Sequence, residues 1–450
     1  MIMRRLPVLS VLLTVLVSCS SLKLGDRPSG SDSADASVRA GQDYVFTEAV
    51  RNFASGRYDA AMDLLQYNLD TDGANAAGCY YLAQLYMSFQ ERSSARKYMP
   101  VCDSLLSESV RLEPDNFWYR RLYAMNLLRM NRKQEAVLQY EELVRRFPSN
   151  SELLLNLAGL YEDLGQYDKV LRVLTRYGQI EDVADELRMQ RVACYLEMNE
   201  LDSAYLESDD PERILEILTS EVSDMLDRIE TDRDRMQCRY MTDMVSGFAD
   251  VALKYDSSLF QAWKTKAIAL LWLGEDKKAL STISRGIAMV SDSVSKSQLY
   301  SMRADYFNLK TGDRELVYSD YDSALIYNPA DVMVMNNYAY FLSLDGRDLN
   351  RALKMSAITI EREPLNATFL DTYAWILFRM EKYVQSRDYL EKALQYMEKP
   401  NPDLYEHFGD VLYKCGDADG ALENWHRAFQ LNSESKLLER KIREKKYLEE

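Results

Sequence analysis

Small and apolar residues recur along this chain with the spacing of helical hairpins. Ala124, Ala136 and Pro148 stand twelve residues apart, and Ala158 repeats the first of these positions 34 residues later. Apolar side chains around them are three or four residues apart, as on one face of a helix. A period of about 34 residues predicts an α-solenoid, because each hairpin buries its apolar face only by stacking on its neighbours. The expected fold class is therefore all-α.

The hairpin pattern occupies two stretches of the chain. The first predicts an N-terminal arm over residues 42–208, and the second predicts a C-terminal arm over residues 257–434. In each hairpin a small residue on the first helix precedes another on the second helix, so that the two backbones pack closely. The positions that carry this pattern are Ala83, Ala95, Ala124, Ala136, Ala158, Ala267, Ala279, Ala304, Ala324, Ala339, Ala352, Ala374, Gly409 and Ala421.

A tyrosine or leucine stands three residues after many of these small residues, as at Tyr86, Tyr161 and Leu377. With this addition the hairpins resemble tetratricopeptide (TPR) repeats, and the five consecutive units of the C-terminal arm match best. The resemblance implies a right-handed superhelix of helical hairpins. Stacked hairpins line the concave side of such an array with the first helix of every unit, which is where a partner is expected to bind.

The pattern loses its register between the two arms. Residues 209–256 predict an irregular helical segment, which starts with Asp210 as a cap and Pro211 in the first turn. Residues 181–234 hold 18 acidic and five basic side chains. This acidic segment is either a solvated spacer or a docking surface, and the sequence leaves both interpretations open.

The first residues predict export and lipid attachment. Arg4 and Arg5 precede a short apolar run, so residues 1–18 have the form of a signal peptide. The run ends Leu16-Val17-Ser18-Cys19, which resembles the bacterial lipoprotein box and implies lipidation of Cys19. An ordinary signal peptide is the alternative. Residues 19–41 are rich in Gly, Ser and Pro and predict a flexible tether. We therefore expect a lipid-anchored protein of the bacterial cell envelope, on the outer membrane facing the periplasm.

The last residues predict a capping helix over 435–450. Leu437, Leu438, Ile442 and Tyr447 share helical spacing among many lysines and arginines. One apolar edge would cover the last hairpin, because terminal repeats need a polar outer face. A basic surface that touches anionic lipid is the alternative.

Composition argues against nucleic-acid binding and catalysis. The 71 acidic and 55 basic residues give a net charge of -16, which repels phosphate backbones. The two histidines, His407 and His426, have no further ligands at zinc spacing, and no glycine-rich phosphate loop is present. We expect no enzyme activity, cofactor or metal. Five cysteines after Cys19 predict buried free thiols, with a Cys79 to Cys102 disulfide as the alternative.

The TPR resemblance also implies which side chains face the concave groove. In such repeats they stand three residues before the small packing residue, one after it, and one turn further on. Carried onto this sequence, the candidate protein- or peptide-binding residues are Tyr80, Gln84, Met87, Arg121, Met125, Leu128, Asn336, Tyr340, Asp371, Trp375, Phe378, Glu406, Asp410 and Tyr413.

The leading hypothesis for function is a membrane-anchored scaffold or adaptor. It would bind other envelope proteins or peptides through its groove, in assembly, secretion or cell-wall machinery, without turnover. A glycan- or nutrient-binding lipoprotein of the SusD type is one alternative, although the repeats here continue to the end without the long insertions that carry such a sugar site. A regulator of a cell-wall enzyme is another, and its sequence would look the same as that of the scaffold.

Overall fold

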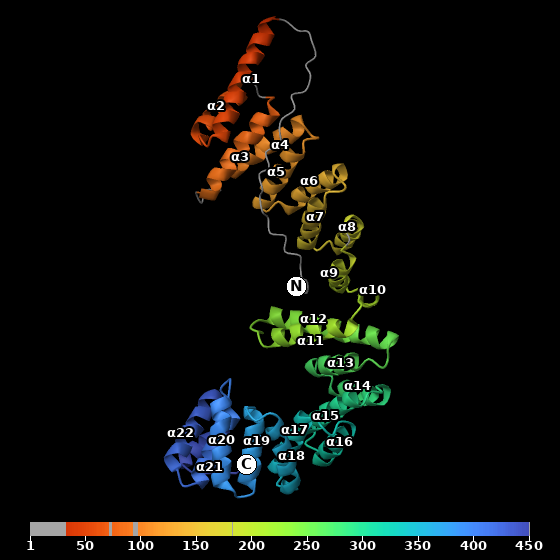
Figure 1. The fold of residues 1–450 in the computed structure, drawn as a ribbon, viewed down its shortest axis with the longest axis vertical. Coiled ribbons are helices and arrows are strands. Elements are labelled where there is room, and N and C mark those ends of the chain that lie inside the picture. The colour runs from red at the N-terminus through yellow and green to blue at the C-terminus, as the bar shows by residue number, and fades with distance from the viewer. Residues whose placement is uncertain (1–32, 72–73, 93–97, 182, 450) are drawn as a thin grey trace. The chain divides into compact units, whose positions relative to one another are not determined.

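The computed structural model describes residues 33–71, 74–92, 98–181 and 183–449, and these residues form 23 helices and no strand. The predicted signal peptide and Cys19 lie outside the described residues. The chain divides into an N-terminal unit, Met1–Asp209, and a C-terminal unit, Asp210–Glu450. Figure 1 shows the helices following one another as antiparallel pairs within each unit. The all-helical solenoid predicted from the sequence is thus confirmed.

The N-terminal unit consists of five consecutive helical hairpins. Each helix packs on the next along the chain, and the pairs within a hairpin make the most extensive contacts. The helices are α1 (Ser33–Ala54), α2 (Tyr58–Thr71), α3 (Ala76–Arg92), α4 (Met99–Leu112), α5 (Phe117–Arg129), α6 (Lys133–Arg146), α7 (Ser151–Asp163), α8 (Tyr167–Ile180), α9 (Ala184–Glu197) and α10 (Leu201–Glu207).

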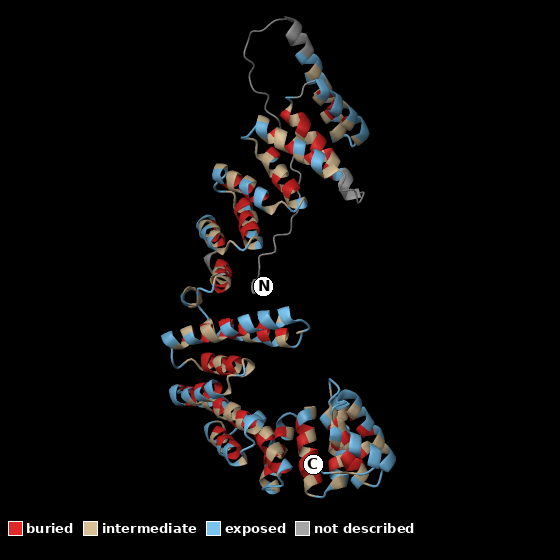
Figure 2. Cartoon of the chain, turned by 180° about the vertical axis from the view of Figure 1, so that it is seen from behind, coloured by how far each residue is buried: buried red, intermediate tan, exposed pale blue. Residues whose placement is uncertain are grey.

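The C-terminal unit consists of six hairpins and a final single helix. Its helices are α11 (Pro211–Leu226), α12 (Asp232–Tyr255), α13 (Phe260–Trp272), α14 (Asp276–Met289), α15 (Ser293–Lys310), α16 (Arg314–Tyr327), α17 (Val332–Leu344), α18 (Leu349–Arg362), α19 (Ala367–Arg379), α20 (Tyr383–Tyr396), α21 (Pro402–Lys414), α22 (Ala418–Leu431) and α23 (Lys436–Glu444). Buried positions follow the sides on which these helices face one another (Figure 2).

The small residues lie where the two helices of a hairpin approach most closely. Ala124 and Ala136 are both fully buried between α5 and α6. In the α19–α20 hairpin the second position is Ser386, whose hydroxyl donates a 2.7 Å hydrogen bond to the carbonyl oxygen of Ala374. At Gly409 in α21, an added Cβ would lie 2.5 Å from Cδ1 of the buried Trp425. The predicted twelve-residue spacing therefore reflects the contact between paired backbones.

The turns inside the hairpins require a left-handed backbone conformation. Gly56 and Gly165 have φ of 72° and 67°, which glycine adopts without steric cost. Asn131 and Glu381 occupy the corresponding turns of other hairpins with φ of 59° and 62°. One residue in this conformation ends the first helix and reverses the direction of the chain, so that the second helix packs antiparallel to the first. Most of these hairpins therefore have a glycine or asparagine at this position.

The irregular middle segment packs as part of the C-terminal unit. Asp210 caps α11 by accepting a hydrogen bond from the Arg213 amide at 3.0 Å, and Pro211 occupies the first turn, as predicted. Thr231 and Asp234 form a capping box at the start of α12. Both helices contact α13. The segment is therefore a further hairpin, longer than the others, that precedes the C-terminal repeats.

The described ends of the chain differ from two details of the sequence prediction. Helix α1 begins at Ser33, so residues 33–41 are helical although they were assigned to the tether. Helix α23 ends at Glu444, and Lys445 turns the chain with a φ of 48°. Tyr447 therefore lies beyond the helix on which its spacing had placed it. The alanines at positions 34, 36 and 40 favour the earlier helix start.

The five cysteines of the described residues are free thiols. Cys79, Cys102, Cys194 and Cys238 are buried, and Cys415 is half-buried. Burial raises the pKa of Cys79 and of Cys102 to about 11. They are packing residues of the helical core, as the sequence indicated, and the alternative disulfide between Cys79 and Cys102 is not formed.

Candidate functional site

The first helices of the last three hairpins form a continuous surface in the C-terminal unit. Helix α19 contacts both α17 and α21 directly, in addition to its own hairpin partner. The predicted groove residues of this unit lie on these three helices. They are Asn336 and Tyr340 on α17, Asp371, Trp375 and Phe378 on α19, and Glu406, Asp410 and Tyr413 on α21.

An aromatic stack joins α19 to α21. The His407 ring lies on Trp375 with their centroids 4.1 Å apart and an interplanar angle of 19°. Phe378 continues the stack on Trp375 at 4.7 Å and 12°. The Nδ1 atom of His407 is 2.9 Å from Oδ1 of Asp371. Stacked rings and this hydrogen bond fix the side chains of neighbouring repeats against each other.

The charge of His407 depends on the carboxylates around it. Burial is the largest single influence and lowers its pKa, but Asp371, Asp410 and Asp403 together outweigh burial. The resulting pKa lies above the usual value for histidine. The histidine is thus a charge partner of Asp371 within the surface, because an opposite charge at hydrogen-bond distance favours the protonated ring.

Two acidic residues predicted for the groove bind a lysine of the chain itself. The Nζ atom of Lys441 in α23 lies 2.7 Å from Oε1 of Glu406 and 2.8 and 2.7 Å from the two oxygens of Asp410. Lys441 and Asp410 are each only 2% exposed. Trp425 donates a further hydrogen bond to Asp410 at 2.9 Å. Burial raises the pKa of Asp410 to about 6, against the opposing effect of Lys441.

Two buried polar atoms of the surface have no hydrogen-bond partner among the described residues. They are Oδ1 of Asn336 and Nε1 of Trp375, in side chains that are 4% and 8% exposed. An unpaired buried donor or acceptor costs about 1 to 3 kcal/mol. Because each atom exposes less than 1 Å² to solvent, both lie beneath the surface and do not reach a ligand bound on it.

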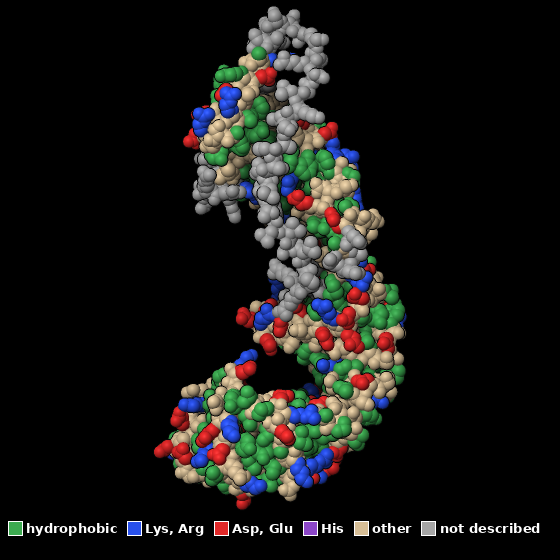
Figure 3. All heavy atoms as spheres, in the orientation of Figure 1, with side chains coloured by type: hydrophobic (Ala, Val, Ile, Leu, Met, Phe, Trp, Pro, Cys, Tyr) green, Lys and Arg blue, Asp and Glu red, His purple; other side chains and the backbone are tan. Residues whose placement is uncertain are grey.

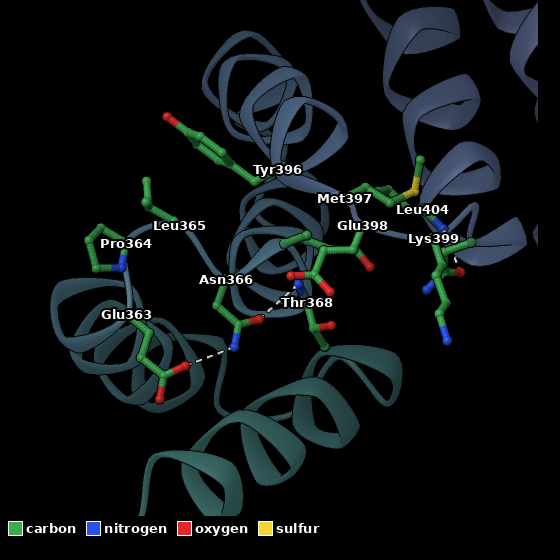
Figure 4. A pocket seen from close by; sticks show the side chains of 13 residues that line it. Glu363, Pro364, Leu365, Asn366, Thr368, Tyr396, Met397, Glu398, Lys399 and Leu404 are labelled. Carbon is green, nitrogen blue, oxygen red and sulfur yellow. Dashed lines mark hydrogen bonds between the residues drawn. The ribbon is translucent and has the colours of Figure 1, made fainter.

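A pocket of about 850 Å³ lies at the N-terminal ends of α19 and α21 (Figure 4). Asp371 lines it, together with Leu365, Thr368, Tyr396 and Leu404. The helix ends beside it are already capped: Asn366 accepts hydrogen bonds from the amides of residues 368 and 369, and Asn401 from those of 403 and 404. Because these amides are engaged, the pocket favours a mixed polar and apolar ligand over a simple anion.

Charge does not gather on the visible face of the C-terminal unit. Figure 3 shows acidic, basic and hydrophobic side chains interspersed over α13 to α22.

The predicted residues of the N-terminal unit are partly engaged with one another. Tyr80 lies against Tyr119 at 4.9 Å and accepts a hydrogen bond from Gln84 at 3.2 Å. Arg121 forms a 2.6 Å ion pair with Glu152 of the next hairpin. The remaining positions are Met87, which is buried between α3 and α4, and Met125 and Leu128, which are half-buried.

Several residues of the surface were missed or interpreted differently at the sequence level. His407, which has no ligands at zinc spacing in the sequence, is a buried residue that links Asp371 to Trp375. Lys441, one of the lysines of the predicted capping helix, is buried. Of the predicted residues, Tyr340 is half-buried near His407 at 6.4 Å, and Tyr413 packs on Trp425 at 5.9 Å. The i, i+3 spacing of Leu438 and Lys441 places both on one face of α23, and this was the only signal for the burial of Lys441.

The described residues contain no cluster of three or more His, Cys, Asp or Glu side chains that could hold a metal ion. None of the helices in the described ranges combines the length and the hydropathy that crossing a bilayer requires.

No model of a known protein family matches this chain. It is 35% identical over 95 residues to a TPR repeat-containing thioredoxin of Arabidopsis thaliana, and 27% identical over 150 residues to a TPR repeat-containing protein of Methanocaldococcus jannaschii. These matches cover 21% and 30% of this chain, and only 14% and 26% of the two relatives. The matches therefore give no information on the remaining parts of those two proteins.

Among solved structures, the chain is similar to the APC/C hetero-tetramer Cut9–Hcn1, with a TM-score of 0.41 and 13% identity, over 92% of this chain and 98% of that one. The hairpin architecture, the buried small residues between paired helices and the two matching sequences agree. The fold of this chain is an all-helical, TPR-like solenoid.

Proposed function

We propose that this protein is a non-catalytic scaffold that binds a segment of another protein on the α17–α19–α21 surface. The observation that carries the proposal is the open pocket of about 850 Å³ at the N-terminal ends of α19 and α21. The Asp371 carboxylate that lines it can accept hydrogen bonds from the amides of a bound peptide. Leu365 and Tyr396, which are 62% and 37% exposed, supply apolar area for the side chains of the peptide.

The pocket offers a pair of substitutions with the same exposure to test this binding site. Leu365 lines the pocket and is 62% exposed, whereas Val384, at the start of α20 and outside the pocket, is 60% exposed. Either position accepts an arginine without disturbing the core. In cross-linking of the full chain in envelope extracts, Leu365→Arg should lose the partners that the unmodified protein and Val384→Arg both retain. Equal recovery from the two variants would reject this surface as the binding site.

The proposed place of action is the bacterial cell envelope, with the protein held by lipid on Cys19. The support is the order of Arg4, Arg5, an apolar run and Leu16-Val17-Ser18-Cys19 in the sequence. Orientation toward the periplasm from the outer membrane, and service in assembly, secretion or cell-wall machinery, are parts of the same proposal. Labelling with an alkyne-bearing fatty acid should mark the unmodified protein and leave Cys19→Ser unmarked. Label retained by that variant would contradict the anchor.

A further inference from the structure

The residues after α23 pack on the C-terminal ends of α19 and α21 as a short peptide would. Beyond Lys445 the chain leaves the helix and runs back to α19. There the Tyr447 ring contacts Phe378, with centroids 5.6 Å apart, and Oε1 of Glu449 accepts a 2.6 Å hydrogen bond from Nη1 of Arg379. Arg379 and Glu449 are 70 residues apart in the sequence. This contact therefore depends on the tertiary fold.

This docking is distinct from the capping of the last hairpin. Capping is performed by α23, whose Leu438 is buried in the cluster formed by Leu412, Ala421, Trp425 and Ala428. Tyr447 belongs instead to the cluster around Trp375 and Phe378, one hairpin earlier. The core of the last hairpin thus remains covered by α23 whether or not residues 445–449 are in place.

The receiving site carries positive charge around an apolar base. Phe378 forms the base, and the Nζ atom of Lys414 stands over the Tyr447 ring at 4.5 Å. The guanidinium of Arg379 binds the carboxylate two residues further on. Among the described residues Lys414 forms no ion pair, and its ammonium group makes a cation–π contact with the Tyr447 ring. The site therefore matches an aromatic ring followed at the second position by a carboxylate.

Lys445 turns the chain out of α23. Its φ of 48° is the left-handed conformation that commonly closes a helix, and the amide of Lys446 donates a 3.3 Å hydrogen bond to the carbonyl oxygen of Lys441. Continuing α23 would instead carry Tyr447 away from Phe378. The docked position of Tyr447 and Glu449 therefore depends on this helix end.

We propose that residues 445–449 are an internal ligand, and that the site formed by Phe378, Arg379 and Lys414 binds partner segments in which an aromatic residue is followed two residues later by a carboxylate. The internal segment occupies this site until such a partner replaces it. The inference rests on the proposed function, because it names the chemistry of the segment that the scaffold binds.

The test supplies the internal ligand as a separate peptide. The full chain lacking residues 445–450 keeps α23, and a fluorescent peptide of residues 443–449 is titrated into it and into the unmodified protein. We expect binding to the shortened chain to be at least tenfold tighter. Equal binding to both proteins, or no saturable binding to the shortened chain at millimolar peptide, would overturn the proposal.

A charge exchange controls for unspecific binding. In the shortened chain, Arg379→Glu should weaken binding of the native peptide at least threefold, and a peptide with Glu449→Arg should recover it. The matched control is Arg387→Glu on α20, outside the site, which should leave binding unchanged. If the Glu449→Arg peptide binds Arg379→Glu no more tightly than the native peptide does, the ion pair does not select the ligand. The same conclusion follows if Arg379→Glu and Arg387→Glu weaken peptide binding equally.

Failure of this inference can be separated from failure of the proposed function. If the peptide does not bind but Leu365→Arg still removes partners, the surface binds proteins and the internal ligand is wrong. If the peptide binds as expected while Leu365→Arg and Val384→Arg recover partners equally, the site exists and the scaffold proposal fails.

Discussion

The two units of this chain use similar repeats but differ in one contact. In both units, partly or fully exposed ion pairs join neighbouring hairpins, as in Arg121 with Glu152 of the N-terminal unit and Arg347 with Glu315 of the C-terminal unit. The C-terminal unit adds a buried triad of Lys441, Glu406 and Asp410, which joins α23 to α21.

Burial changes what an ion pair contributes. An exposed pair stabilises little because water screens it and its formation costs side-chain entropy, whereas a buried charge left without its partner is strongly destabilising. Equal spacing in the repeats therefore does not imply equal contributions to stability.

Removing the buried lysine should have the largest effect. Lys441→Ala leaves Asp410 and Glu406 without their cation, and we expect it to lower the free energy of unfolding by about 3 to 5 kcal/mol. Urea unfolding followed by tryptophan fluorescence measures this loss. Lys133→Ala in the N-terminal unit is the matched control, where an exposed partner keeps the change below about 1 kcal/mol. Similar losses from both variants would remove the distinction between the units.

Two glycine-to-alanine substitutions should have opposite signs. At Gly409 the added Cβ meets Trp425 and the carbonyl oxygen of Ala421, so overpacking should destabilise by about 1 to 3 kcal/mol. At Gly159, an exposed position inside α7, no atom lies within 4 Å. Alanine there should stabilise by about 0.5 to 1 kcal/mol through the lower entropy of the unfolded chain. Thermal unfolding of both variants measures the sign, and the same sign for both would contradict the packing argument.

The stability of the C-terminal unit should depend on pH through His407. Its folded pKa lies above the unfolded value, so its contribution is complete below the unfolded pKa, about 6.5, and is lost as the pH rises through the folded pKa. Hydrogen exchange of the α19 and α21 amides at pH 5.5 and 8.5 measures this change. In His407→Gln the difference between the two pH values should shrink. If His407→Gln leaves the pH dependence of exchange unchanged, titratable groups other than His407 cause it.

Arg121→Ala should have the smallest effect. The side chain of Arg121 is 25% exposed, and its partner Glu152 is 51% exposed, so the pair should contribute at most about 1 kcal/mol. Urea unfolding in low and high salt measures the contribution, which salt should reduce in the unmodified protein and not in the variant. If the free energy of unfolding falls by more than about 2 kcal/mol, this pair contributes to stability as a buried ion pair does.

The hairpins and their order were predictable because they depend on local spacing. Ala124 and Ala136 fix one contact, and Gly409 and Ala421 fix another, through residue size alone. Asp210 and Pro211 marked the start of α11 because capping and proline effects operate within one turn. The length of the α11–α12 hairpin and its place in the C-terminal unit were not predictable, since they depend on packing against α13.

The candidate surface was predictable only in part. The repeat geometry placed Asp371 and Trp375 on the inner helices, where the structure has them. The partner of each side chain lies in another repeat, and sequence spacing contains no information on such pairs. For this reason the link between His407 and Asp371 was not predicted, and Glu406 and Asp410 were expected to face a ligand.

The sequence by itself determined the helical hairpins, their twelve-residue contacts and the breaks between them, because these follow from residue size, helix period and capping within a short stretch of chain. Only the tertiary structure decided that Lys441 is buried against Asp410, and that Tyr447 and Glu449 return to Phe378 and Arg379. These contacts join residues 31 to 70 positions apart. Their energy depends on burial and on the water excluded around them, which the order of residues alone does not specify.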